Sequence, residues 1–240
     1  MFSALLRRYP VPVAYLAVLG AMYAVVTPFL SASDHRFFLR WASTNLANLT
    51  NRPVSTLVVS AFVSEETMLL WIVLTSTGLV LLVRRFGNLR AAFLVIIAHI
   101  AGTLVSEGIT AVRVSVGAAP QAVRHAIDVG PSYVTVSALV AVVCYGRGLW
   151  QRAVALGGCL VLAPFLFEGI TGFDIAAVGH VVSMLAGILL GALFARQHPR
   201  DHAVAGRSTV PRSVDAGLLR GGGRGRPLMR RMLRPRTRLG

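Results

Sequence analysis

Long apolar runs alternate with short polar connections up to about residue 195, and this pattern predicts membrane-spanning helices. A helix needs ~20 apolar residues to cross the ~30 Å hydrocarbon core of a bilayer. The first run exceeds the ~7–15 apolar residues of a signal peptide, so we expect it to be a retained span. The six runs are Val11–Leu30, Met68–Val83, Ala91–Val112, Gly130–Tyr145, Ala153–Ile170 and Asp174–Ala195. The pattern therefore predicts an all-α polytopic membrane protein, a six-transmembrane-helix bundle.

Two segments lie outside this regular pattern. Residues 31–67 contain "HRFFLRWASTNLANL", in which aromatic side chains are mixed with arginine. Such a mixture is typical of a segment that lies in the membrane interface, and an ordinary amphipathic loop helix is the alternative. Residues 199–240 contain "GGGRGRP" and few apolar residues. We therefore expect a membrane domain over residues 1–198 and a disordered, Arg-rich cytoplasmic tail over residues 199–240.

Composition strengthens the membrane assignment, and charge indicates the topology. Hydrophobic residues make up 55% of the chain and charged residues 14%, and all 24 basic residues are arginine. Residues 196–240 hold 12 Arg against two Asp, which is +10 of the net charge of +15. A basic tail beside a membrane span indicates contact with anionic lipid head groups rather than with nucleic acid. The arginine-rich, lysine-free composition suggests a bacterial protein, which we expect in the inner membrane.

The positions of the arginines orient the six predicted spans. Arginines lie before the first span, in the connections between spans two and three and between spans four and five, and in the tail. The connection between spans five and six carries none. Because arginine accumulates on the cytoplasmic side, both termini are predicted to be cytoplasmic.

Polar residues inside spans are candidates for function because burying them in lipid is unfavourable. Their depth follows from counting residues to the nearest inner arginine at ~1.5 Å per helical residue. Ser132 lies ~22 Å above that level, His180 and Glu168 ~24 Å, Glu107 ~26 Å and His99 ~14 Å. Four of these groups, from four spans, therefore share one layer below the outer surface.

The fourth predicted span begins with "DVGPSY", where Asp128 precedes an apolar segment of only ~24 Å. A span this short is expected to start below the membrane surface, in a hollow lined by protein. Ser132 would then stand at a helix start beside free backbone N–H groups, a position suited to a nucleophile near an oxyanion site. A serine that simply caps the helix is the alternative.

The sixth predicted span carries small residues at every fourth position. They are Gly179, Ser183, Gly187 and Gly191. Such a stripe lets another helix approach closely. His180 borders the stripe, so we expect its side chain to face the protein interior, either as a general base or as an inert structural histidine.

Cysteine usage indicates neither a metal site nor a disulfide framework. Cys144 and Cys159 are the only cysteines, and both fall inside apolar segments. Buried small hydrophobic residues are the simplest interpretation. We expect no metal and no cofactor.

Three stretches resemble the rhomboid family of intramembrane serine proteases. They are "SAFVSEETMLLWIVLTSTG" followed by "RRFGNLR", "GPSY" in place of the family's G-x-S-G motif, and "GHVVSMLAGILLG" in the sixth span. The resemblance covers roughly residues 50–195 and is closer to a divergent bacterial rhomboid-like group with a D-V-G-x-S-Y pattern. It implies a six-span rhomboid-like bundle in which Ser132 is the nucleophile and His180 its base.

The resemblance also implies a substrate and a supporting set of residues. The substrate would be a transmembrane protein that enters from the side. Gly130 and nearby amides would hold the oxyanion. The remaining supporting candidates are Tyr133, Glu107, His99, Asp128 and Glu168, of which Glu107 or Glu168 would orient His180 as the acid of a triad does.

Departures from the family pattern keep an alternative open. The second span lacks the His and Asn that rhomboid proteases use at the oxyanion site, Tyr133 replaces the closing glycine, and Val136 replaces a supporting aromatic ring. The two main hypotheses are a serine-type intramembrane endopeptidase and a catalytically inactive rhomboid-like protein that binds membrane helices as clients. A small transporter or channel is a third.

Overall fold

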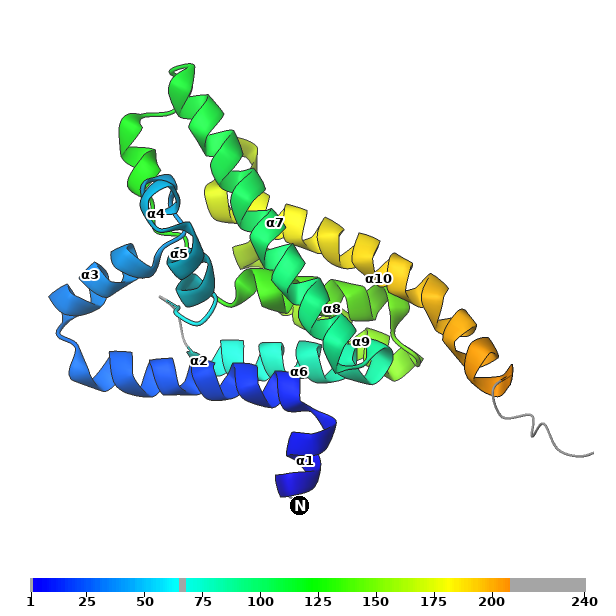
Figure 1. Ribbon diagram of the computed structural model, residues 1–240. Coiled ribbons are helices and arrows are strands. Elements are labelled where there is room, and N and C mark those ends of the chain that lie inside the picture. Colours follow the sequence, from blue (N-terminus) through cyan, green and yellow to red (C-terminus); the bar gives the residue numbers. More distant parts are fainter. Residues whose placement is uncertain (1, 65–67, 208–240) are drawn as a thin grey trace, which may run out of the picture.

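The computed structural model describes residues 2–64 and 68–207, and helices form nearly all of that part of the chain (Figure 1). Four helices are long and apolar enough to cross a membrane: α6 (Met68–Phe86), α7 (Asn88–Ser115), α9 (Leu149–Leu166) and α10 (Ile175–Arg207). Two further apolar helices, α2 (Pro10–Phe29) and α8 (Ser132–Tyr145), complete the bundle. The predicted helical membrane bundle is confirmed.

The ends of the helices follow from local chemistry. Proline occupies the first turn of α2, where its missing N–H leaves no hydrogen bond unmade. Gly87 alone separates α6 from α7 and has a φ of 85°, which glycine adopts without steric penalty. Gly169 (φ 72°) similarly lies in the turn after α9, directly before the short 3₁₀ helix η2 (Ile170–Gly172).

Helix α8 lies at the centre of the bundle and packs against α6, α7, α9 and α10. At ~1.5 Å per residue it covers only ~21 Å, less than the ~30 Å hydrocarbon core. Its side chains are buried on nearly every face, among them Val136, Leu139 and Val142. Because protein rather than lipid surrounds it, this helix does not have to span the bilayer.

The small residues of α10 lie against α7 and α8. A Cβ on Gly187 would lie 2.6 Å from the Ser137 carbonyl oxygen, and one on Gly191 would lie 2.6 Å from the Tyr145 ring. The Ser183 hydroxyl donates a hydrogen bond to the Ala98 carbonyl at 3.0 Å. The close approach of these helices therefore depends on the absence of larger side chains on α10.

The connection between α2 and α6 folds into three short helices at one end of the bundle, beside the 3₁₀ helix η1 (Gln121–His125) (Figure 1). These are α3 (Ala32–Ala42), α4 (Leu46–Asn51) and α5 (Pro53–Ser60). In α3, Leu39 and Ala42 face a small core, whereas Phe37 is 73% exposed. A further short helix, α1 (Phe2–Arg8), precedes α2 at the end far from α3 and projects away from the bundle (Figure 1).

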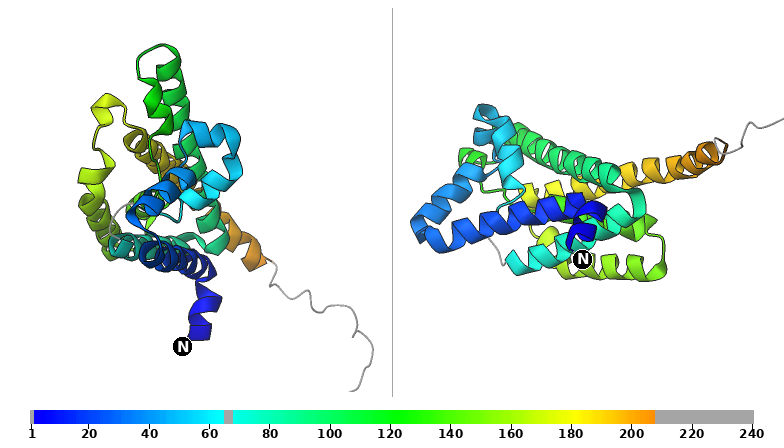
Figure 2. Two further views of the ribbon diagram at one scale, coloured as in Figure 1. Left: turned by 90° about the vertical axis from the view of Figure 1, so that its left-hand side faces the viewer. Right: turned by 60° about the horizontal axis from the view of Figure 1, so that its bottom comes forward.

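Two predicted boundaries differ from the structure. The fifth helix begins at Leu149 and ends at Leu166, so Arg152 lies inside it and donates to the Cys144 carbonyl. Helix α10 continues past residue 198 to Arg207 and extends beyond the other helices (Figure 2). Residues 208–240 of the predicted disordered tail lie outside the described residues.

Candidate functional site

A cavity of about 170 Å³ lies where α8 begins and α9 ends. Ser132 and His180 both line it, together with Trp71 of α6 and Phe165 of α9. The segment from Ile127 to Gly130 forms another part of its wall. The structure thus brings the predicted nucleophile and the predicted base to one cavity.

Ser132 is the first residue of α8 and is partly exposed. The first N–H groups of a helix have no partner inside the helix, so the Ser132 amide is available at this end. No hydrogen bond joins the Ser132 hydroxyl to His180 within the described residues. Ser132 and His180 therefore line one cavity without a hydrogen bond between them.

The hydrogen bond of His180 fixes which of its ring nitrogens can accept a proton. Nδ1 lies 3.1 Å from the Leu166 carbonyl oxygen, at the C-terminal end of α9. Because a carbonyl only accepts, Nδ1 carries the hydrogen of the neutral ring and Nε2 keeps its lone pair. Nε2 is buried and has no hydrogen-bond partner in the described part of the chain. A backbone carbonyl therefore orients His180, and the expectation that Glu107 or Glu168 would do so is wrong.

Tyr133 packs against His180 from inside the bundle. The two ring centroids are 5.2 Å apart and the planes are nearly perpendicular at 81°. On its other side Tyr133 meets His99 at 5.9 Å. The phenol fits between α7 and α10 because Gly102 and Gly179 have no side chains, and a Cβ on Gly179 would overlap the phenol oxygen. Tyr133 thus provides the aromatic support for His180 that Val136 cannot give.

Asp128 holds the far end of Tyr133. The phenol donates to Asp128 Oδ2 at 3.1 Å, and the Thr44 hydroxyl reaches the same oxygen at 3.1 Å. Backbone contacts fix Asp128 as well, because Thr44 N–H donates to its carbonyl and Ser43 Oγ accepts from its amide. Burial raises the Asp128 pKa to about 6, although the hydrogen bonds from Tyr133 and Thr44 oppose this rise. The segment between α3 and α4 is therefore connected through Asp128 and Tyr133 to His180.

The remaining predicted residues differ in their relation to the cavity. Glu107 is buried near Asp128, and neither of its carboxylate oxygens has a hydrogen-bond partner among the described residues. His99 donates to the Leu57 carbonyl at 2.9 Å and lines a separate apolar cavity of about 460 Å³ between α2, α5 and α7. Glu168 is exposed beyond the end of α9, because that helix ends earlier than predicted. The structure therefore places Glu107 and His99 around the site and leaves Glu168 outside it.

Gly130 lines the cavity, but its amide is already used. The Gly130 N–H donates to the Ser60 carbonyl at 2.9 Å. The expectation that this amide holds an oxyanion is therefore wrong. The positive φ of Gly130, 142°, instead lets the chain turn into α8.

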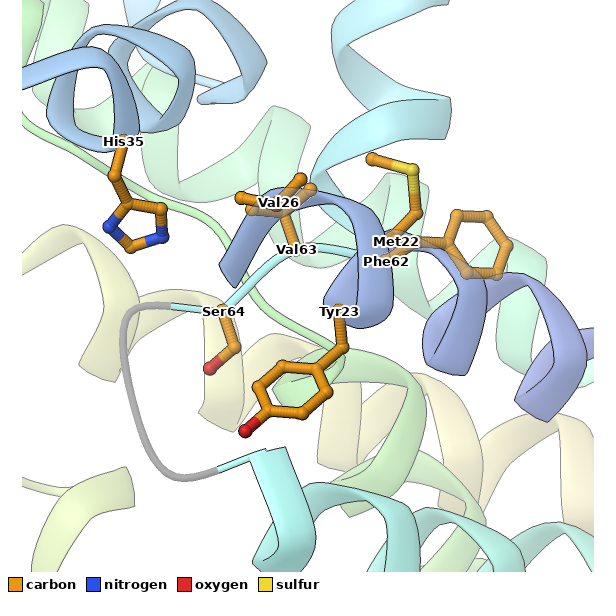
Figure 3. Close-up of a pocket in the computed structure, with 7 residues that line it drawn as sticks. All are labelled: Met22, Tyr23, Val26, His35, Phe62, Val63 and Ser64. Atoms are coloured by element: carbon orange, nitrogen blue, oxygen red, sulfur yellow. The ribbon is translucent and has the colours of Figure 1, made fainter. Parts of the chain in front are cut away.

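Sequence reasoning missed Ser64 and Trp71, which line the cavity from the α5–α6 side. Ser64 also borders a small neighbouring cavity between α2, α3 and the end of α5, where Tyr23 and His35 lie (Figure 3). No periodic pattern marks Ser64, since it lies in a connection rather than in a helix. One signal for Ser64 was available in the sequence: it lies just before the second predicted span, which lacks the His and Asn that rhomboid proteases use at the oxyanion site.

Together, the bundle and the cavity define a helical membrane protein that gathers a serine and a histidine at the start of a short central helix. A family model described as rhomboid-like protein matches residues 4–198. The chain therefore belongs to the rhomboid-like family. No curated protein and no solved structure shows a significant match to the chain.

Proposed function

We propose that this rhomboid-like membrane protein is an intramembrane serine endopeptidase that uses Ser132 and His180. The observation that supports it best is the tautomer of His180. With Nδ1 held by the Leu166 carbonyl, Nε2 is the ring nitrogen left as an acceptor, and His180 lines the same cavity as Ser132. A neutral imidazole of this kind can take the proton of a serine hydroxyl.

The reaction would proceed by acyl transfer. Ser132 Oγ attacks the peptide carbonyl while its proton passes to His180 Nε2, and the resulting imidazolium then protonates the departing amine. Water hydrolyses the acyl-enzyme with the same histidine as base. The Ser132 amide and the Ser64 hydroxyl are the donors proposed for the oxyanion, since both belong to residues that line the cavity.

The proposed substrate is a transmembrane segment that enters between α6 and α9. Trp71 and Phe165 line the cavity from these two helices, so its wall on this side is apolar. A lipid-embedded peptide would reach Ser132 without crossing a charged surface. The proposed location is a bacterial inner membrane with cytoplasmic termini, and this orientation is supported by Arg8, Arg84 and Arg147, which line one cavity at one end of the bundle.

A fluorophosphonate probe tests the proposal without a known substrate. Nucleophilic attack by Ser132 Oγ on phosphorus expels fluoride and leaves a stable adduct. The purified full-length chain is expected to be labelled at Ser132, and Ser132→Ala to remain unlabelled. Ser76→Ala, a helix serine bonded to its own backbone, is the matched control and should label normally. Equal labelling of wild type and Ser132→Ala would reject the assignment.

A second function is favoured by the missing hydrogen bond between Ser132 and His180 and by the absence of His and Asn in the second span. In this case the protein binds membrane helices of client proteins without cleaving them. Ser132→Ala would then leave the cellular phenotype intact, whereas a bulky residue at Gly187 would abolish it by forcing α10 away from α8. A phenotype as sensitive to Ser132→Ala as to gene deletion contradicts this function.

A further inference from the structure

The turn between α3 and α4 consists of three polar residues, Ser43, Thr44 and Asn45, each at most 3% exposed. Polar groups buried to this extent are kept only where they find hydrogen-bond partners. The Ser43 N–H ends α3 by donating to the Leu39 carbonyl at 2.9 Å. The Asn45 side chain begins α4 by accepting from the Asn48 N–H at 2.9 Å. The two helix ends therefore fix the turn on both sides of Thr44.

Thr44 directs its own hydrogen bonds to Asp128, 84 residues further along the chain. Its N–H donates to the Asp128 carbonyl at 3.0 Å. Its hydroxyl lies 3.0 Å from the same carbonyl oxygen and 3.1 Å from Oδ2 of the Asp128 side chain, so one proton is shared between two acceptors. Ser43 Oγ also accepts from the Asp128 N–H at 2.9 Å. The turn therefore holds the backbone of Asp128 through amide contacts and its carboxylate through the Thr44 hydroxyl.

The carboxylate oxygen that Thr44 contacts is the one that holds Tyr133. The Tyr133 phenol donates to Asp128 Oδ2 at 3.1 Å, and the Tyr133 ring lies 5.2 Å from the His180 ring. His180 is otherwise held through Nδ1 by the Leu166 carbonyl. A shift of Oδ2 would release the phenol, and the Tyr133 ring could then tilt away from His180. The position of the imidazole therefore depends on a hydroxyl that lies outside the cavity.

We propose that Thr44 is a positioning residue for the Ser132–His180 pair. Its hydroxyl holds Asp128 Oδ2, and this oxygen holds the phenol of Tyr133. Tyr133 in turn keeps the His180 ring in the orientation that leaves Nε2 as the acceptor. The effect on catalysis rests on the proposed function, whereas the orientation of His180 can be measured without it. The inference gives the long connection between α2 and α6 a role in the chemistry of the site.

Thr44→Val tests this role with a side chain of nearly the same shape. Valine keeps the amide bond to the Asp128 carbonyl and removes only the hydroxyl. Asp128 is ionised above its pKa of about 6, so the lost hydrogen bond is charge-assisted under neutral conditions. Labelling of Ser132 by the fluorophosphonate probe is expected to slow by about tenfold, the size of one such bond. Thr44→Ser keeps the hydroxyl and should label within about twofold of wild type.

Thr56→Val is the matched control for burying a valine in place of a threonine. Thr56 belongs to the same connection and, like Thr44, is 1% exposed. Its hydroxyl contacts the Arg52 and Pro53 carbonyls at the start of its own helix, α5. Thr56→Val should therefore label like wild type. Equal losses in Thr44→Val and Thr56→Val would overturn the proposal, because the loss would then follow the burial of the hydroxyl alone.

A double mutant shows whether Thr44 acts through Tyr133. Tyr133→Phe keeps the ring beside His180 and removes the hydroxyl that reaches Asp128. In the Tyr133→Phe protein, Thr44→Val should slow labelling by less than about twofold, because the link that it weakens is already broken. A full additional tenfold loss would contradict the proposed link. Thermal unfolding shows whether each variant is folded, and Thr44→Ala, which adds no methyl group beside the carboxylate, serves if Thr44→Val fails that check.

The tautomer of His180 gives a readout that does not require a reactive serine. Nitrogen NMR of the full-length chain with labelled histidine rings shows which ring nitrogen carries the proton, and His180→Asn identifies the His180 signal. Wild type, Thr44→Ser and Thr56→Val should carry it on Nδ1, whereas Thr44→Val should show a share on Nε2. A wild type that the probe does not label would reject the proposed function, and the tautomer would still test the role of Thr44. An unchanged tautomer in folded Thr44→Val would overturn the positioning role.

Discussion

Replacing Gly179 by alanine tests whether Tyr133 is held in a slot between α7 and α10. The new methyl group would overlap the Tyr133 phenol, so the ring has to move away from His180 or the helices have to separate. Overpacking of this kind costs about 1–3 kcal/mol. Losing the hydrogen bond from Tyr133 to Asp128 adds about 1 kcal/mol to this cost, and the higher helix propensity of alanine offsets about 1 kcal/mol of it. We expect a net loss of about 2 kcal/mol in the free energy of unfolding.

The measurement is reversible unfolding in mixed micelles, with Gly108→Ala as the matched control. Gly108 lies in α7, and a Cβ there would meet nothing within 4 Å. The control should be neutral or more stable by up to about 1 kcal/mol. Tyr133→Ala should make Gly179→Ala less costly, because it removes the group that the methyl strikes. The reasoning is refuted if Gly179→Ala and Gly108→Ala have the same free energy of unfolding, or if Tyr133→Ala does not change the effect.

Three further predictions follow from the same geometry. The folded-state pKa of Asp128, about 6, lies above the ordinary value of 3.8, so the folded protein keeps a proton that the unfolded chain releases. The free energy of unfolding should therefore fall by up to about 3 kcal/mol between pH 4 and pH 6, and Asp128→Asn should remove this part of the pH dependence when both proteins are titrated in parallel. Ser64→Ala should slow fluorophosphonate labelling of Ser132 by up to about 10²-fold without unfolding the protein, and an unchanged rate would exclude it as an oxyanion donor. Gly87→Ala should destabilise the protein by about 1–2 kcal/mol in thermal unfolding because of its positive φ, and a neutral result would contradict the single-residue turn.

Much of the architecture follows from the hydrophobic pattern, because a bilayer requires long apolar helices. The start of α8 at Ser132 agrees with the short length of the fourth apolar run. The contacts of Gly187 and Gly191 agree with the four-residue spacing of small residues in the sixth. Counting apolar residues misplaces the end of α9, because Phe167 and Ile170 continue the apolar pattern although the helix ends at Leu166 and the left-handed Gly169 follows in the turn. That difference moves Glu168 out of the site.

The contacts between side chains of the site were harder to derive from the sequence than the helices. The role of Leu166 as the acceptor for His180 involves a backbone carbonyl, which has no sequence signature. The position of Tyr133 depends on two glycines from different helices, Gly102 and Gly179, and only packing shows that they meet. Asp128 was recognised as a candidate by its place before the fourth span, but its link to Thr44 crosses 84 residues. Such long-range pairs cannot be inferred from spacing along a single chain.

The rate of fluorophosphonate labelling at Ser132 in His180→Ala, compared with His99→Ala, tests the central claim most directly. Both histidines are buried and both contact Tyr133, but only His180 shares the cavity with Ser132. We predict that His180→Ala slows labelling by about 10²-fold or more, whereas folded His99→Ala keeps most of the wild-type rate. Labelling of His180→Ala at the wild-type rate would contradict a Ser132–His180 pair.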